Sequence, residues 1–269
     1  MLSSHRGAAR RRLSGTLDDD GARGQNGTDT LKATIPEGMR LYAIGDIHGR
    51  ADLLDRLALK IAADLAARPV AQASIVFLGD YVDRGLDSRG VLERLANADF
   101  PTPIVALRGN HEDVMLRFLD DTAMLPQWAM FGGLTTLASY GVDTGAEMAR
   151  GGAPAVQAAL LARFPQAHRR LLEETKLSAV YGDYFFCHAG VRPHVPLDRQ
   201  DAGDLMWIRY EFLEYRGDFG KEIVHGHTPH VKVQSLENRI NLDTHAYRSG
   251  VLTAVALEGV ERRFIDTAG

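Results

Sequence analysis

The strongest constraint on the fold of this chain is an alternation of strand and helix patterns between residues 40 and 120. Short apolar runs predict buried strands at 41–44, 74–80 and 104–110. Apolar residues at helical spacing predict helices over 51–66, around 91–95 and from His111 onward. Strands and helices that alternate in this way form parallel sheets with right-handed crossovers. Such sheets bind ligands at the carboxyl ends of their strands, so we expect functional residues there.

The rest of the chain divides into a helical part and a strand-rich part. Residues 120–176 carry helical patterns broken by Pro and Gly, and they show no strand pattern. After residue 176, short β-rich segments alternate with turn residues, which predicts a largely antiparallel second half. We therefore expect an α/β fold (α+β in some schemes) in which two mixed β-sheets pack as a sandwich with helices outside.

The first 37 residues differ from the rest in composition. They are rich in Gly, Arg, Ser, Asp and Thr and poor in large apolar residues, which predicts a disordered tail over 1–37. A transit peptide is an alternative for the start of this tail, which is Arg-rich and free of acids up to Leu17. The folded domain would then span 38–269, with 120–176 as a helical insert beside the site.

Charge and composition exclude several classes of protein. The net charge of −4 argues against a nucleic-acid binder, because such proteins usually carry a basic excess. No apolar run reaches the roughly 18 residues of a membrane span, so no membrane partner is expected. Cys187 is the single cysteine, which rules out an internal disulfide and fits a reducing, cytoplasmic location.

Polar residues follow five of the expected strands, and each group is flanked by glycine. The segments are 45–49 (GDIHG), 79–85 (GDYVDRG), 109–112 (GNHE), 187–190 (CHAG) and 225–229 (HGHTP). Taken alone, Asp80 or Asn110 could cap a helix, and His188 or His227 could be an ordinary core histidine. Five such groups at strand ends make a shared site the better interpretation.

The residue types in these segments suit metal ions. Asp46 and His48 are two positions apart, so in an extended segment their side chains point the same way and could chelate one ion. Carboxylate, imidazole and amide oxygen ligands suit Mn, Fe or Zn, and the lack of thiolates argues against a structural zinc site. A carboxylate can bridge two ions, and paired ions commonly assist displacement at phosphorus.

In this order the five segments resemble the phosphoprotein phosphatase family of the calcineurin-like metallophosphoesterase superfamily. They are closest to its bacterial branch, which includes the phage lambda protein phosphatase, and the match runs from about residue 40 to the C-terminus. The resemblance implies a four-layer fold and attack on phosphorus by a hydroxide that bridges two divalent ions. Manganese is favoured, with iron or zinc as alternatives.

The resemblance also implies a role for each residue at a matching position. Asp46 and His48 would hold the first metal, Asp80 would bridge both, and the second metal would be held by Asn110, His188 and His227. His111 would be the general acid and Asp83 would orient it. The substrate phosphate would be bound by Arg84, Arg209 and Asn110, with Arg192 and Arg248 as weaker candidates.

Three positions depart from the family pattern or have no assigned role. Pro229 stands where many superfamily members have a further histidine ligand, so Asp46 and His48 would be the first metal's only terminal protein ligands. His225 is expected to be a strand histidine behind the site. His245 stands where bacterial relatives commonly have glycine, and it could line the rim or be exposed. The stretch FGGLTTLASYG has no chemical role in this interpretation.

Three functions are compatible with these residues. The first is a protein serine/threonine phosphatase, with phosphotyrosine as a further substrate, acting on phosphoproteins or phosphopeptides. The alternative is a diadenosine tetraphosphatase-like nucleotide hydrolase, whose branch typically lacks the aspartate that precedes the arginine in the second motif. Asp83 is present here, which favours the first function. The third is a binding module without activity, which would have lost a ligand or His111, and neither is lost.

Overall fold

The computed structural model describes residues 32–268, and these residues belong to a single compact unit. The tail and transit peptide predicted for the N-terminus fall on residues 1–31, outside the described residues. Residues 32–37 belong to the described chain, and Ile35 is buried with its N–H donating to the carbonyl of Gly259. Residues 32–37 therefore pack against the domain, although the predicted boundary lies at residue 38.

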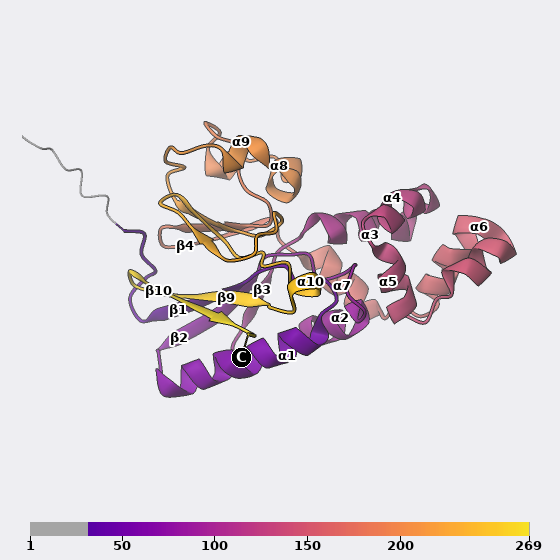
Figure 1. Cartoon of the computed structure of the whole chain (residues 1–269), viewed down its shortest axis with the longest axis horizontal. Helices are drawn as coiled ribbons and strands as arrows, with labels where there is room; N and C mark the ends of the chain where they lie inside the picture. The colour runs from indigo at the N-terminus through magenta and orange to yellow at the C-terminus, as the bar shows by residue number, and fades with distance from the viewer. Residues whose placement is uncertain (1–31, 269) are drawn as a thin grey trace, which may run out of the picture. The chain divides into compact units, whose positions relative to one another are not determined.

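The first sheet contains the three predicted parallel strands and a hairpin from the end of the chain. Its strand order is β10-β9-β1-β2-β3, in which β1 pairs in parallel with β2, and β2 with β3 (Figure 1). The antiparallel hairpin pairs with β1 along its other edge. The strands are β1 (Met39–Ile44), β2 (Gln72–Phe77), β3 (Ile104–Ala106), β9 (Thr253–Glu258) and β10 (Glu261–Asp266).

The second sheet is built from the strand-rich part that follows residue 176. Its order is β4-β5-β6-β8-β7, with parallel pairs β5–β6 and β6–β8 at its centre and antiparallel pairs at its two edges. Both sheets are therefore mixed, as predicted. The strands are β4 (Ser178–Tyr181), β5 (Tyr184–Cys187), β6 (Glu222–His225), β7 (Gln234–Ser235) and β8 (Arg239–Asn241).

Helices lie outside the sheets and connect them. Figure 1 shows α1 beneath the first sheet and α8 and α9 above the second. The helices are α1 (Ala51–Ala67), α2 (Ser88–Ala96), α3 (Asn110–Asp120), η1 (Thr122–Met124), α4 (Leu125–Met130), α5 (Gly133–Ser139), α6 (Thr144–Leu161), α7 (Gln166–Glu174), η2 (Leu197–Arg199), α8 (Ala202–Trp207), α9 (Tyr210–Leu213) and α10 (Ala246–Ser249). None of the helices between residues 32 and 268 has the length and apolarity needed to cross a membrane.

Three apolar cores separate the layers and explain the sequence patterns. Leu41 and Ala43 of β1 face the core between the two sheets, while Tyr42 and Ile44 face the helices. Because both faces of β1 are buried, its sequence is a continuous apolar run rather than an alternating one. A third core packs Ile223 and its neighbours against Phe212 of α9. Two mixed sheets flanked by helices confirm the predicted fold class.

The C-terminal third departs from expectation in its pairing. A largely antiparallel second half was expected, yet the centre of the second sheet is parallel and the last hairpin joins the first sheet. The short helices α8, α9 and α10 were also not predicted. Helices of four to six residues carry too few turns for a periodic apolar pattern, and strand pairing over long sequence distances is invisible to local patterns.

Asp64 of α1 anchors the open edge of the first sheet. Its carboxylate accepts hydrogen bonds from Arg263 at 2.6 Å, from Arg68 at 2.6 Å and from the Tyr42 hydroxyl at 2.7 Å, and buried Arg40 lies 3.3 Å away. Burial alone would raise the pKa of Asp64, but the hydrogen bonds from Arg263 and Tyr42 outweigh burial and lower it.

We therefore expect Asp64→Asn to lower the free energy of unfolding by about 3 kcal/mol at neutral pH, because it removes the charge that accepts from Arg263, Arg68 and Tyr42. It also leaves buried Arg40 with Glu258 as its remaining carboxylate partner, at 2.7 Å. Since the pKa of Asp64 is depressed in the fold, this contribution is complete above the ordinary carboxyl pKa of about 4 and declines as the pH falls further. Urea unfolding at several pH values measures it. Asp55→Asn is the control, because it removes an exposed ion pair with Arg94 that should contribute under about 1 kcal/mol. Similar losses in both variants would contradict the proposed anchor.

Candidate active site

The five polar segments come together where strands of both sheets end. β1, β2 and β3 of the first sheet lead into the segments that hold His48, Asp80 and Asn110. β5 and β6 of the second sheet lead into His188 and His227. All five side chains are buried. The carboxyl ends of parallel strands meet at one edge of each sheet, which is why segments far apart in sequence can share a site.

One group of ligand atoms surrounds the first carboxylate oxygen of Asp80. His188 Nε2 lies 3.3 Å from Asp80 Oδ1, 3.0 Å from Asn110 Oδ1 and 3.1 Å from His227 Nδ1. Single ligand atoms of Asp80, His188 and His227 all lie within 4.8 Å of one another. These are the residues expected to hold the second metal together with the bridging carboxylate.

A second group surrounds the other oxygen of Asp80. His48 Nε2 lies 3.5 Å from Asp80 Oδ2, and His111 Nε2 lies 3.7 Å from the same atom. This group differs from the expected first-metal set, because His111 and not Asp46 is brought within 4.8 Å of His48 and Asp80. The carboxylate of Asp46 instead accepts from the backbone N–H of His227 at 3.1 and 3.2 Å.

The donor chemistry of both groups fits divalent cations. Nδ1 of His48 donates to the carbonyl of Val82 and Nδ1 of His188 to that of Leu78, each at 2.9 Å, so both Nε2 lone pairs face the centre. Burial lowers the pKa of His48, His188 and His227 and keeps these imidazoles neutral. Nε2 atoms of His111 and His227 are buried without a hydrogen-bond partner in the described chain. The Nε2 lone pairs of His48 and His188 converge on the two oxygens of Asp80, and such groups repel one another unless a cation lies between them.

Asp243 adds a carboxylate that was missed in the sequence. Burial, Asp243 and Asp80 together raise the pKa of Asp46 well above its ordinary value, and burial raises the pKa of Asp243 to about 6. Three neighbouring buried carboxylates are costly without a positive counterpart, which again fits a cation site. Asp243 lies in the stretch NLDT after β8, and a lone aspartate in such a stretch resembles an ordinary turn residue.

His111 and Asp83 form the expected pair, held by the helical segment. His111 Nδ1 lies 2.7 Å from Asp83 Oδ2. Trp128 Nε1 donates to the same carboxylate at 3.0 and 3.1 Å, and the Thr136 hydroxyl donates to Asp83 Oδ1 at 2.7 Å. Thr136 belongs to FGGLTTLASYG, so this stretch positions Asp83. No sequence pattern distinguishes these two residues from other buried residues of 120–176.

Glu112 is a further residue that was not assigned a role. Its buried carboxylate accepts from the backbone N–H groups of Asp80, Tyr81 and Gly109 at 2.8, 2.7 and 2.9 Å. It therefore ties the loop that carries Asp80 to the start of α3, which carries Asn110 and His111. The only hint in the sequence is its place at the end of the GNHE motif.

The candidate arginines occupy different environments. Arg84 is half-buried, and its Nη1 donates to His48 Nε2 at 2.9 Å, so it reaches the centre of the site. Arg209 is exposed at the edge of the site, with Nη2 3.3 Å from the carbonyl of His227. Arg192 makes a bidentate ion pair with Asp204 at 2.6 Å, and Arg248 is exposed. The geometry favours Arg84 and Arg209 for phosphate.

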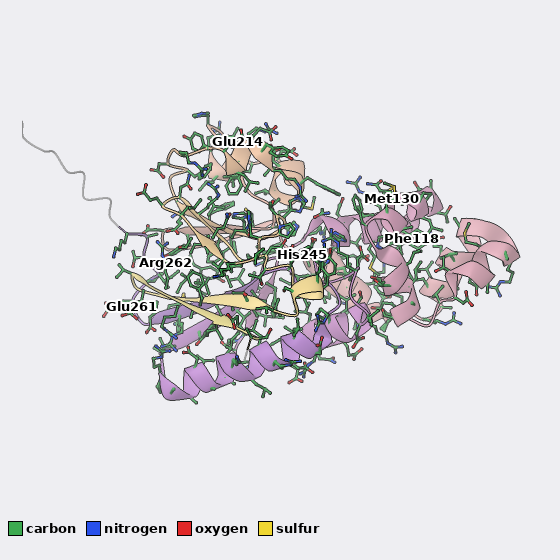
Figure 2. All side chains as sticks on the ribbon, viewed as in Figure 1. Phe118, Met130, Glu214, His245, Glu261 and Arg262 are labelled. Carbon is green, nitrogen blue, oxygen red and sulfur yellow. The ribbon has the colours of Figure 1, made fainter. Side chains whose placement is uncertain are left out.

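The two remaining histidines, His225 and His245, lie in different surroundings. His225 points away from the ligand atoms, with its ring 4.8 Å from that of Phe212 and its Nδ1 donating to the carbonyl of Gly226. His245 precedes α10, where Figure 2 labels it, and its Nε2 lies 2.8 Å from the hydroxyl of Tyr247. The Tyr247 ring in turn lies 5.4 Å from that of His48. His245 is thus half-buried at the rim of the site.

Backbone strain concentrates at this site. Five of the eight non-glycine residues with positive φ in the described chain are His48, Asp80, Asp83, Arg84 and His227. Two glycines allow close approach here, since a Cβ on Gly226 would lie 2.0 Å from Asp46 Oδ1 and one on Gly109 would lie 2.1 Å from Asp80 Oδ1. Strained conformations of this kind cluster at functional sites.

Comparison with known families agrees with this arrangement. A model of the calcineurin-like phosphoesterase family matches residues 39–255, which is most of the chain. The chain belongs to the calcineurin-like phosphoesterase family. It is therefore a hydrolase of the metallophosphoesterase class, and the superfamily identified from the five motifs is confirmed.

Several curated proteins similar to this phosphoesterase carry the same name. A bis(5'-nucleosyl)-tetraphosphatase PrpE, of the asymmetrical type, from Oceanobacillus iheyensis is 25% identical over 248 residues, covering 86% of this chain and 92% of that protein. The protein of the same name from Geobacillus thermodenitrificans is 27% identical over 240 residues, covering 81% and 90%. The similarity therefore extends over nearly the whole length of both relatives.

Solved structures similar to this phosphoesterase share its fold. One is a crystal structure of a protein provisionally assigned as a diadenosine tetraphosphatase, with a TM-score of 0.58 and 19% identity, covering 89% of this chain and 96% of that chain. Another is the cold-active protein-tyrosine phosphatase of a psychrophilic Shewanella, with a TM-score of 0.53 and 16% identity, covering 86% and 83%. At these identities the two structures are informative about fold alone.

The predicted protein serine/threonine phosphatase, with phosphoprotein or phosphopeptide substrates, is contradicted by the names of the curated relatives. The error has a physical reason in Asp83, whose presence favoured the protein phosphatase over the nucleotide hydrolase. The Asp83 carboxylate contacts His111, Trp128 and Thr136, so its place in the fold is to hold the His111 ring. A residue in that position carries no information on what lies beyond the phosphate.

Proposed function

We propose that this phosphoesterase hydrolyses dinucleoside tetraphosphates, adding water across one P–O–P bond. The observation that carries the proposal is the similarity to bis(5'-nucleosyl)-tetraphosphatases over 81–86% of the chain. The relatives are of the asymmetrical type, so we expect a nucleoside triphosphate and a nucleoside monophosphate as products. Symmetrical cleavage would give two diphosphates instead.

Aromatic rings on two sides of the site support a nucleotide substrate. Phe131 has its ring 5.6 Å from that of His111 and 5.6 Å from that of Trp207, which lies 6.3 Å from His227. Tyr247 lies on the His48 side, with Arg84 5.3 Å above its ring. A dinucleoside polyphosphate has a base at each end, and bases bind by stacking on such rings.

Two divalent ions would be held by the buried carboxylates and imidazoles around Asp80, with Asn110, as assigned from the motifs. When bound, they would neutralise phosphate oxygens and lower the pKa of water for attack on phosphorus. Manganese is the first ion to test, and iron and zinc are alternatives with similar ligand preferences.

The protein's own side chains position the substrate and move one proton. Arg84, beside His48, and Arg209, beside His227, would bind phosphate oxygens, because planar guanidinium groups match their geometry. His111 would donate the proton on Nε2 to the departing phosphate oxygen. Asp83 would accept from Nδ1 of His111 and fix the ring in that orientation, and Trp128 and Thr136 would hold Asp83.

A side-by-side assay tests the proposed function. The purified protein with added manganese is incubated with diadenosine tetraphosphate and, separately, with a phosphoserine peptide, and the products are separated by anion-exchange chromatography. We expect the dinucleotide to turn over at the higher kcat/KM. Faster turnover of the peptide would contradict the proposal, and a yield of two diphosphates would contradict asymmetrical cleavage.

Trp207 provides a prediction about the base. We expect Trp207→Leu to raise KM for diadenosine tetraphosphate about tenfold, because stacking of one base contributes about 1–3 kcal/mol. Turnover of p-nitrophenyl phosphate, which carries no base, should stay within about twofold. Trp207→Phe keeps an aromatic ring on which a base can stack, so it should preserve most of the affinity. Tyr210→Ala is the control, because it removes a neighbouring aromatic ring that is 73% exposed, and it should leave KM unchanged. Equal losses on both substrates would show that Trp207 maintains the site rather than binding the base.

Three coarser features complete the proposal. Residues 38–269 would constitute the catalytic domain, and the helical insert at 120–176 would form the wall beside the site. A cytoplasmic location, expected from the single cysteine, stays a prediction. Descent from the phosphoprotein phosphatase branch also stays a prediction, because the family match extends only to the wider phosphoesterase family.

A further inference from the structure

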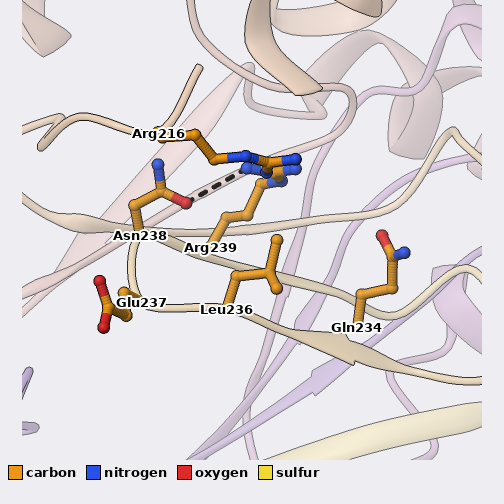
Figure 3. A pocket seen from close by; sticks show the side chains of 6 residues that line it. All are labelled: Arg216, Gln234, Leu236, Glu237, Asn238 and Arg239. Atoms are coloured by element: carbon orange, nitrogen blue, oxygen red, sulfur yellow. Dashed lines mark hydrogen bonds between the residues drawn. The ribbon is translucent and has the colours of Figure 1, made fainter. Parts of the chain in front are cut away.

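A cavity lies on the outer face of the second sheet, where β7 and β8 meet the loop after α9. It has a volume of about 370 Å³ and is lined by Arg216, Gln234, Leu236, Glu237, Asn238 and Arg239 (Figure 3). None of the residues assigned to the active site lines it. Its volume lies in the range of small-molecule sites, so we considered which ligand its side chains would bind.

Arg239 is the unusual member of this lining. Its side chain is only 3% exposed, and it makes no ion pair with any residue between 32 and 268. Its acceptors are neutral: Nη2 donates to the carbonyl of Leu213 at 2.6 Å, and Nη1 to Asn238 Oδ1 at 3.2 Å and to the carbonyl of Tyr215 at 3.4 Å. Its Nε has no hydrogen-bond partner. A buried cation without a counter-charge costs several kcal/mol, so this arrangement needs a reason.

A purely structural role explains part of the arrangement. Arg239 lies over the ring of Phe212 at 5.5 Å and bonds to carbonyls at the end of α9, as basic residues commonly do at helix ends. That role uses the two terminal nitrogens only. It leaves the Nε–H unpaired, and it does not explain why a second arginine shares the same place.

Arg216 brings a second positive charge to the same carbonyl. Its Nη1 lies 3.4 Å from the Leu213 oxygen that also accepts from Arg239. Burial and the charge of Arg216 both lower the pKa of Arg239. Arg216 is exposed and could extend into water, yet its guanidinium lies beside that of Arg239. The carboxylate of Glu237 points away from both guanidinium groups in Figure 3.

We propose that this cavity binds a phosphate group between Arg216 and Arg239, either free or carried by a mononucleotide. The two guanidinium groups would share the anion, and the side-chain amide of Gln234 would donate from the cavity wall. Charge-assisted hydrogen bonds from paired guanidinium groups are among the stronger anion contacts in proteins. The proposal stands on this cavity alone and does not depend on which substrate the active site hydrolyses.

Binding is tested with the full chain in a background that lacks the active-site phosphate contacts. The protein carries Arg84→Ala and Arg209→Ala, EDTA is present, and calorimetry follows titration with inorganic phosphate and, separately, with adenosine monophosphate. We expect saturable binding to one site. Adding Arg216→Ala should weaken it about tenfold or more, the fold-change expected for one lost charged hydrogen bond.

Matched variants distinguish the cavity from general charge effects. Arg199→Ala removes an equal charge from an exposed arginine that does not line the cavity, and it should leave affinity unchanged. Arg239→Lys keeps the charge but loses the planar guanidinium with its several N–H donors, so it should also weaken binding. If that variant does not fold, the result for Arg216→Ala is used to test the proposal. Tighter binding of the nucleotide than of phosphate would identify a nucleotide site, and the reverse a free-phosphate site. No saturation by either ligand up to about 10 mM, or equal affinity with and without Arg216, would overturn the proposal.

Discussion

Asp80→Asn is expected to reduce kcat/KM for diadenosine tetraphosphate by about 10³-fold or more, on the order of 4 kcal/mol. Asp80 is the one residue shared by both groups of ligand atoms, with His188 on one oxygen and His48 on the other. Asparagine keeps the shape and keeps an acceptor for the backbone N–H of His111, whose nitrogen is 3.2 Å from Asp80 Oδ1. What it removes is the negative charge between two proposed cations.

Metal content provides a readout that does not depend on activity. After dialysis against manganese, the wild-type protein should hold two ions per chain by elemental analysis, and Asp80→Asn should hold one or fewer. Asp113→Asn is the control, because its carboxylate pairs with Arg117 on the surface of α3. Retention of both ions together with near-normal turnover in Asp80→Asn would contradict the bridging role.

His111→Ala should show a loss that depends on the leaving group. A simple alkyl phosphate must expel an alkoxide, so removal of the general acid should lower kcat by about 10²-fold or more. Hydrolysis of diadenosine tetraphosphate instead releases a phosphate group whose last pKa is about 6. This leaving group is stable as an anion, so it depends much less on a proton from His111. Steady-state kinetics on glycerol phosphate and on diadenosine tetraphosphate measure the difference.

A second variant separates proton donation from simple disruption. Asp83→Asn keeps the shape of the carboxylate but loses the charge that orients His111, so it should show the same dependence on leaving group with a smaller loss. The controls are the urea midpoints of both variants, which should show that each is folded. Equal losses on the two substrates in His111→Ala would contradict the assignment of His111 as acid.

Strand ends and their polar residues were predictable from sequence because the signal is local. Each of these residues follows an apolar run and has a glycine nearby, so the sequence alone places Asp46, His48, Asp80, Asn110 and His188 at strand ends. Their convergence then followed from the geometry of parallel sheets. The structure also explains why His225 and His227 point to different places. His225 is the last residue of β6, and its ring packs on Phe212.

Contacts between distant segments were not predictable in the same way. Trp128 and Thr136 come from helices 45 and 53 residues after Asp83, and nothing local marks their polar atoms as facing a carboxylate. Asp243 and Glu112 are single acids whose burial depends on packing of both sheets. The substrate class was wrongly predicted for a related reason, because Asp83 contacts His111, Trp128 and Thr136 and does not identify the group attached to the phosphate.

The strained backbone of the active site has a consequence for how this protein could be made more robust. His48, Asp80, Asp83, Arg84 and His227 each combine a positive φ, which glycine adopts most easily, with a side chain that glycine lacks. Such conformations cost about 1 kcal/mol or more at each position, and glycine would relieve them only by removing a functional group. Directed evolution for heat tolerance should therefore accumulate its gains outside these loops, for example around Asp64, and leave these five positions unchanged wherever activity is also selected.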